Sequence, residues 1–221
     1  TVPATASSVA SASAVVPMIR TWKAVRDPPQ PLVGRGRSSA EQAGGLVRIK
    51  DSKFVTYSTP EGLSNDNARS VLEDRAGNLW IGTFGGLNRL KDGRFSAYGV
   101  KDGLSSEVVL SMLEDRDGAL WLGTLGGGLN RFKDGRFTVY GREQGLSNDT
   151  ILCLLQDRDG VLWAGTRSGG LHRLDNGRFR AYGTQDGLSS NDIRVLHQGR
   201  DGALWIGTLG GGLNRYQDGR F

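Results

Sequence analysis

One sequence motif of about 42 residues is written almost four times over in this chain of 221 residues. Its marker tryptophans stand 41, 42 and 42 residues apart, at Trp80, Trp121, Trp163 and Trp205. A strict period of this length is typical of repeat arrays, in which each unit buries its apolar face against the next unit. The period therefore constrains the fold more strongly than the composition does. It also moves the search for function from single residues to rows of equivalent loop positions.

One repeat, residues 145–182, predicts four short strands at 151–156, 161–166, 171–174 and 179–182. Asp-Gly and Asn-Gly pairs separate them, and such pairs favour hairpin turns because Gly and Asn adopt positive φ easily. Four antiparallel strands in this length form a propeller blade. We expect the apolar 151–156 run to be the innermost strand, buried on both faces, and 179–182 to be the outer edge. A helical array is excluded, because the 34 glycines and the absence of an apolar stripe at helical spacing oppose it.

The expected fold class is therefore all-β, a β-propeller of about four to five four-stranded antiparallel blades. The repeat array is expected to run from 44 to 221, as a partial blade 44–61 followed by blades 62–102, 103–144, 145–186 and 187–221. The partial unit supplies only the strands at 46–49 and 54–57, and the last blade lacks its outer strand. The 54–57 strand could complete that last blade, although 46–49 would then be left over. We expect a fragment of a larger propeller or an open array, with an assembly of chains and a small closed ring as the alternatives.

Residues 1–43 share little with the repeats and are expected to be an irregular low-complexity and linker segment. Within it, Val15–Ile19 is too short for a membrane span or a signal sequence, and Ser39 stands where a further blade would have its tryptophan. The formal charge of +5 comes from residues 1–50, because residues 51–221 hold 21 basic and 21 acidic side chains. The array is therefore charge-balanced, and nucleic acid is not an expected partner.

The core of each repeat also carries a family resemblance. A Gly-x-Leu-Trp-x-Gly-Thr segment followed by Gly-Gly-Leu-x-Arg, as in Gly118–Thr124 with Gly127–Arg131, resembles the two-component regulator propeller repeat. That repeat builds the sensor region of bacterial hybrid two-component histidine kinases. The resemblance implies a non-catalytic, ligand-sensing segment in the periplasm or another extracytoplasmic space, with an oligosaccharide as the candidate ligand. It also implies a signalling partner or a kinase region, and the kinase, receiver, membrane-spanning and DNA-binding parts have no counterpart in this sequence.

Two other functions remain open at this point. One is a protein–protein interaction scaffold without a small ligand. The other is a fragment of a propeller lyase or hydrolase, since streptogramin-degrading lyases resemble this chain in architecture. Fold alone does not decide between these functions.

The candidate binding face is the one on which the longer, more varied loops open. These are the crossovers between blades and the turns between the second and third strands. One position in those turns varies where the repeats otherwise agree, and Arg167 is the leading candidate in that row: Phe84, Leu125, Arg167 and Leu209. The crossovers contribute side chains that can hydrogen-bond a sugar or a peptide but can also satisfy turn backbone: Asn65, Asp66, Ser106, Glu107, Asn148, Asp149, Ser190 and Asn191.

Motifs for other chemistry are weak. The Asp-x-Asp-Gly segments at 115–118 and 157–160 lack the later ligands of a calcium loop and predict turns, so no metal or cofactor is expected. The tryptophans are expected to pack between blades, with a sugar-stacking platform as the alternative. His172 and His197 are isolated substitutions without a paired acid, and Cys153 is expected to be a small buried thiol. We therefore expect no catalytic residue.

Overall fold

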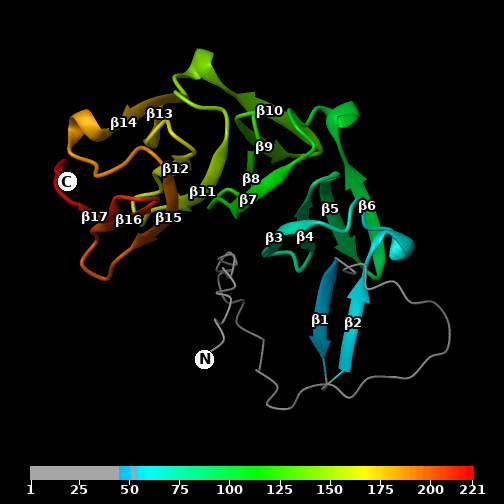
Figure 1. The fold of residues 1–221 in the computed structure, drawn as a ribbon. Helices are drawn as coiled ribbons and strands as arrows, with labels where there is room; N and C mark the ends of the chain where they lie inside the picture. The colour runs from blue at the N-terminus through cyan, green and yellow to red at the C-terminus, as the bar shows by residue number, and fades with distance from the viewer. Residues whose placement is uncertain (1–44, 51–52) are drawn as a thin grey trace, which may run out of the picture.

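The computed structural model describes residues 45–50 and 53–221, so the expectations for residues 1–43 and Ser39 lie outside the described residues. The described strands form five antiparallel sheets that follow one another along a curved row (Figure 1). Three sheets have four strands each, one has two and one has three. The described residues include no helix that is long and apolar enough to span a membrane.

Each four-stranded sheet runs in chain order from its innermost to its outermost strand. The first comprises β3 (Ala68–Glu73), β4 (Leu79–Thr83), β5 (Gly86–Lys91) and β6 (Arg94–Tyr98). The second comprises β7 (Val109–Glu114), β8 (Leu120–Thr124), β9 (Leu129–Lys133) and β10 (Arg136–Tyr140). The third comprises β11 (Ile151–Gln156), β12 (Leu162–Thr166), β13 (Leu171–Asp175) and β14 (Arg178–Tyr182). The predicted all-β class with four-stranded antiparallel blades is confirmed, and in the third sheet the strand limits differ from the prediction by at most one residue.

Short 3-10 turns, which the sequence analysis did not predict, lie in the crossovers between sheets. They are η1 (Thr59–Glu61), η2 (Val100–Asp102), η3 (Arg142–Gln144) and η4 (Thr184–Asp186). Each ends at a glycine with positive φ, such as Gly145 at 99°. Each also begins with a backbone N–H capped by the side chain three residues on, as where the Gly141 N–H donates to Gln144 Oε1 at 2.8 Å.

The innermost strands β3, β7, β11 and β15 (Ile193–Gln198) contact one another along the row, which confirms their predicted position. The predicted burial of this strand on both faces is wrong. In β11 only Ile151 is fully buried, whereas every residue of β12 is buried. The reason is that β12 is packed between two neighbouring sheets, through Leu162 on one side and Trp163 on the other, while β11 lines the open inner side of the row.

Adjacent sheets pack through the repeated residues. Trp80, Trp121 and Trp163 are no more than 5% exposed, and the indole Nε1 of each donates to an aspartate of its own sheet. Packing between blades, the expected role of the tryptophans, is confirmed for these three, whereas Trp205 is half-buried. Beside Trp163, a Cβ on Gly165 would lie 2.6 Å from Cγ2 of Ile193 in the next sheet. Only glycine lets the branched side chain of the following sheet sit this close.

The two ends of the row differ from its middle. At one end, β1 (Leu46–Lys50) pairs only with β2 (Lys53–Tyr57). The Tyr57 ring meets Phe95 edge-on at 5.7 Å, as Tyr140 meets Phe179 between the second and third sheets. The β1–β2 pair therefore stands where the outer strands of a preceding sheet would be.

At the other end, β15 pairs with β16 (Leu204–Thr208), and β16 pairs with β17 (Gly212–Tyr216). The suggestion that the 54–57 strand completes the last blade is wrong, because β2 pairs with β1 instead. In the part of the chain that the structure describes, β17 has no neighbour on its outer side, and the row is open (Figure 1).

Candidate ligand-binding face

The structure brings the two predicted loop sets together on one face of the row. In every sheet from the first to the fourth, the backbone N–H of the varied turn residue donates to a crossover carbonyl of the same sheet. The donors and acceptors are Phe84 to Asn67 at 3.1 Å, Leu125 to Val108 at 3.0 Å, Arg167 to Thr150 at 3.0 Å and Leu209 to Asp192 at 2.9 Å. We call Phe84, Leu125, Arg167 and Leu209 the variable row. Its backbone is fixed in the same way four times.

The side chains of the variable row, by contrast, are largely free. Leu125 is 39% exposed and Leu209 is 58% exposed, although both are apolar. Arg167 is exposed, and its guanidinium makes no hydrogen bond or ion pair within the described residues. Phe84 is half-buried, with the guanidinium carbon of Arg69 4.8 Å from its ring centroid. A fixed backbone with side chains that do no structural work is what a recognition position requires.

Four of the predicted crossover side chains hold their own loops. Asn65 and Asn148 each accept the backbone N–H two residues on, at 2.8 and 2.9 Å. Ser106 and Ser190 accept the equivalent N–H and donate to the carbonyls of Leu125 and Leu209, at 2.9 and 3.0 Å. These side chains support the variable row from behind.

The crossover position that comes next in the chain, Asp66, Glu107, Asp149 or Asn191, lies beside the 3-10 turn of the same crossover. Asp66 and Asn191 each accept the N–H of that turn's first residue, at 2.7 and 2.9 Å. Asp149 pairs with Arg142 of η3 at 3.0 Å, and Glu107 is exposed. The Glu107, Asp149 and Asn191 carbonyls also accept an N–H from a glycine of the preceding sheet, so this position joins sheets.

A polar pair lies beneath each crossover, with its Asn or His fully buried in the first three sheets and half-buried in the fourth, and sequence reasoning missed it. In the second sheet, Asn130 Oδ1 accepts the Ser105 N–H at 3.0 Å, and its amide nitrogen donates to Ser105 Oγ at 2.6 Å. The first and fourth sheets repeat the pair with Asn88–Ser64 and Asn214–Ser189. The sequence does carry a signal for this pair. In three repeats an Asn follows the Gly-Leu of the third strand, at a nearly constant distance from the Ser of Gly-Leu-Ser.

The third sheet uses His172 in place of asparagine. Its Nε2 accepts the Ser147 N–H at 3.1 Å and lies 2.7 Å from Ser147 Oγ. The imidazole is completely buried, and burial lowers the pKa of His172 to about 4. Ser147 Oγ also donates to the Gly169 carbonyl at 2.6 Å. Because a backbone N–H occupies the Nε2 lone pair, the histidine is placed to hold the loop rather than to take a proton from the serine.

The opposite face is bound together by its own turns. The Arg75 guanidinium donates to the Arg116 carbonyl at 2.8 Å, Arg116 donates to the Asp157 carbonyl at 3.2 Å, and Arg158 donates to the Arg200 carbonyl at 2.8 Å. Each of these donors reaches from one sheet to the next. They tie the turns on this face into a continuous chain of contacts.

The Asp-x-Asp-Gly segments form these turns, as predicted. Asp115 Oδ1 accepts the N–H groups of Asp117 and Ala119, and its Oδ2 accepts Trp121 Nε1 at 2.8 Å. The carboxylate is therefore fully used within the sheet. In the residues described here, no three potential metal ligands come together.

Cys153 lies on β11 at the interface with β15, and its Sγ is 4.0 Å from the Ile193 carbonyl. Burial raises the pKa of the thiol to about 12. The thiol is thus protonated at neutral pH and a poor nucleophile.

These features define an open array of propeller blades, and comparison with known proteins identifies its repeat. The model of the two component regulator propeller matches residues 62–85, 103–126, 145–168 and 187–210. The array therefore carries four copies of the two-component regulator propeller repeat, as the sequence resemblance indicated. A comparison with curated protein sequences gives no match.

Solved structures support the fold. One is the extracellular domain of BT4673 from B. thetaiotaomicron, described as a hybrid two component system, at a TM-score of 0.67 and 24% identity. The alignment covers 80% of this chain and 27% of that structure, so the chain spans about a quarter of its length. A virginiamycin B lyase from Staphylococcus aureus aligns at a TM-score of 0.60 and 18% identity, covering 80% of this chain and 64% of the lyase. An extracellular domain of a two component system and an enzyme thus share this fold.

Proposed function

We propose that the array of residues 44–221 is a ligand-sensing segment of a two-component signalling protein, that it works outside the cytoplasm and that it has no catalytic role. The repeat family and the extracellular domains of two component systems with the same fold support the class of protein. The single observation that carries the proposed binding face is the variable row. Its backbone is fixed by crossover carbonyls, while the side chains of Leu125, Arg167 and Leu209 are exposed and that of Phe84 is half-buried.

The chemistry of the row suits an oligosaccharide or a ligand of similar mixed polarity. Phe84 offers an aromatic ring for stacking on the apolar face of a sugar. Arg167 offers several N–H donors for hydroxyl groups, and Leu125 supplies apolar contact between them. Asp149 and the other crossover residues would hold the loops in place for that ligand. Binding would then bias a conformational equilibrium in the attached signalling region.

The non-catalytic part of the proposal rests on the histidine. A propeller enzyme of the lyase kind needs side chains that reach its substrate, whereas His172 is completely buried and hydrogen-bonded to Ser147. Turnover of any substrate by this chain would contradict this part of the proposal. The scaffold alternative is favoured by no specific contact.

The test is binding of the purified chain to a panel of oligosaccharides, with affinity measured by calorimetry for any ligand found. Arg167→Ala is expected to weaken binding by about tenfold or more, because it removes a charged donor. Arg200→Ala, an exposed arginine on the opposite face, is the matched control and is expected to leave the affinity unchanged. If both variants bind as the wild type does, the ligand does not lie on the variable row. If no glycan binds and a stable protein partner is recovered, the scaffold function replaces this proposal.

A further inference from the structure

A second feature that binding could use lies at the outer corner of the second sheet, at the end of the β9–β10 hairpin. A notch of about 380 Å³ there is lined by Arg131, Lys133, Asp134, Arg136 and Thr138. The hairpin turn opens on the face opposite to the variable row. Three cations and one carboxylate line the notch, so two positive charges are in excess.

The cations are held close together by the strand register. Lys133 lies directly opposite Arg136, and Arg131 lies directly opposite Thr138. Side chains in directly opposite positions lie within about 5 Å at Cβ, and like charges there destabilise a sheet. The Arg131 guanidinium is also positioned by the Trp121 ring, whose centroid is 5.8 Å away.

No carboxylate relieves this repulsion. Within the described residues, none of the three cations forms an ion pair or donates a side-chain hydrogen bond. They are therefore unpaired donors that converge on one hollow.

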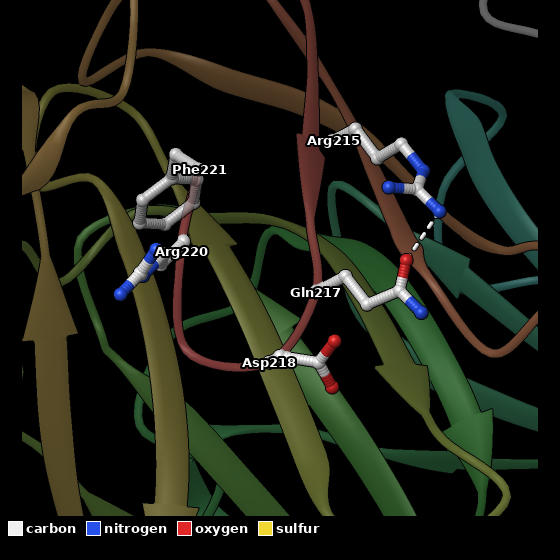
Figure 2. Close-up of a pocket in the computed structure, with 5 residues that line it drawn as sticks. All are labelled: Arg215, Gln217, Asp218, Arg220 and Phe221. Carbon is white, nitrogen blue, oxygen red and sulfur yellow. Dashed lines mark hydrogen bonds between the residues drawn. The ribbon is translucent and has the colours of Figure 1, made fainter.

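The other hairpins show that the fold does not require this arrangement. In the third sheet the same positions are Asp175 opposite Arg178, an attractive pair. At β17 they are Gln217 and Arg220. A notch also forms at β17, where Arg215 is hydrogen-bonded to Gln217 (Figure 2) and pairs with Asp201 at 2.9 Å. The like-charge pair recurs in the backbone register of two other hairpins, as Lys91 opposite Arg94 in β5–β6 and Lys50 opposite Lys53 in β1–β2.

We propose that the notch of Arg131, Lys133 and Arg136 binds a tetrahedral oxyanion, a phosphate or a sulfate group, either free or carried on a soluble polymer. Several N–H donors on converging cations match the several acceptor oxygens of such a group. Binding would also remove the repulsion between Lys133 and Arg136. The site is separate from the variable row and does not depend on the ligand proposed there.

The decisive variant is Lys133→Asp, which copies the pair that the third sheet already uses. Inorganic phosphate, inorganic sulfate and dextran sulfate are titrated separately against the full chain, with chloride at matched ionic strength as the reference because salt screens charges. For the wild type, the melting temperature is expected to rise by about 3 °C at an anion concentration ten times Kd. In Lys133→Asp the affinity is expected to fall about tenfold or more, while the melting temperature without anion stays equal or rises.

Two controls make the result specific. Lys101→Asp, an exposed lysine on η2, makes the same change in net charge and is expected to keep the anion response. Asp134→Asn removes the one carboxylate in the notch and is expected to tighten binding. A response to dextran sulfate alone, lost in Lys133→Asp, assigns the anion to a polymer, and a response to the inorganic ions assigns it to a free anion. An equal response in wild type and Lys133→Asp, or no response beyond chloride, overturns the proposal.

Discussion

The third and fourth sheets place nearly the same residues in two different environments. Leu171 on β13 is 0% exposed, whereas Leu213, at the same position on β17, is 65% exposed. Trp163 is 5% exposed and bonded to Asp157, whereas Trp205 is half-buried and Gly199 stands in place of that aspartate. The sequence of a blade is therefore not what buries its residues. Burial comes from the neighbouring sheet, which covers the third sheet and, among the described residues, does not cover the fourth.

This difference separates two kinds of repeated position. Residues such as Leu171 and Gly165 are the same in every blade because the next sheet packs against them. The backbone of the variable row is fixed mainly by the crossover of its own sheet, and Arg167 alone of the row also forms a β-bridge, with Asp192 of the following sheet. The side chains of the variable row can therefore differ from blade to blade, whereas the residues at the interface between sheets are constrained by packing.

The largest expected effect comes from truncating the buried leucine. Leu171→Ala should lower the free energy of unfolding by about 2–5 kcal/mol, because it leaves a cavity between two sheets. Leu213→Ala at the equivalent exposed position should change it by less than about 0.5 kcal/mol. Urea denaturation of both variants measures the difference. Equal costs would mean that the outer face of the fourth sheet is covered in solution, and the contrast between the two sheets would fail.

The next effect depends on pH and distinguishes His172 from its counterpart Asn214. Burial lowers the pKa of His172 to about 4, so the folded chain keeps the imidazole neutral while the unfolded chain protonates it near pH 6.5. The stability is therefore complete above about pH 6.5 and falls as the pH drops toward 4, by about 3 kcal/mol in total.

His172→Asn restores the side chain that the other three sheets use and should remove this part of the pH dependence. Denaturation of the wild type and the variant at several values between pH 4 and 7.5 gives the comparison, and other titrating groups cancel in the difference. Parallel curves for the two proteins would contradict the assignment of a buried neutral imidazole.

The fold could be predicted to within a residue in the third sheet because each strand is bounded by its own turn signals. Asp-Gly and Asn-Gly pairs act locally, and the repeat period predicted the packing of Trp163 and of its counterparts Trp80 and Trp121 between sheets. The burial of β11 could not be predicted, because its exposure depends on how strongly the row of sheets curves and whether it closes. The pairing of β2 with β1 could not be predicted either, because sequence spacing does not distinguish β1 from the last blade as the partner of β2.

The candidate face was predicted more coarsely. Successive turns of a blade open on alternate faces, and this alternation placed the variable row and the crossovers on one side. In the structure the two are hydrogen-bonded to each other there. Residue type alone did not reveal that Asn65 and Ser106 bond their own turns, because the same side chains can serve a ligand or a backbone. Asn130 and Ser105 lie 25 residues apart; the sequence shows that both recur in the repeats, and the structure shows that they bond each other.

The smallest effect in the comparison concerns two glycines. A Cβ at Gly165 would lie 2.5 Å from Cys153 Sγ and 2.6 Å from Ile193 Cγ2, both within the packed interface. Gly165→Ala should therefore cost about 1–3 kcal/mol of unfolding free energy through overpacking. At Gly207 the close contact is only with Val195 Cγ1, and Val195 is 55% exposed and free to change its rotamer. Gly207→Ala should cost clearly less, and urea midpoints measured side by side decide the matter. If the two alanines cost the same, the close approach of Ile193 is not what requires glycine at this position, and the requirement lies within the sheet itself.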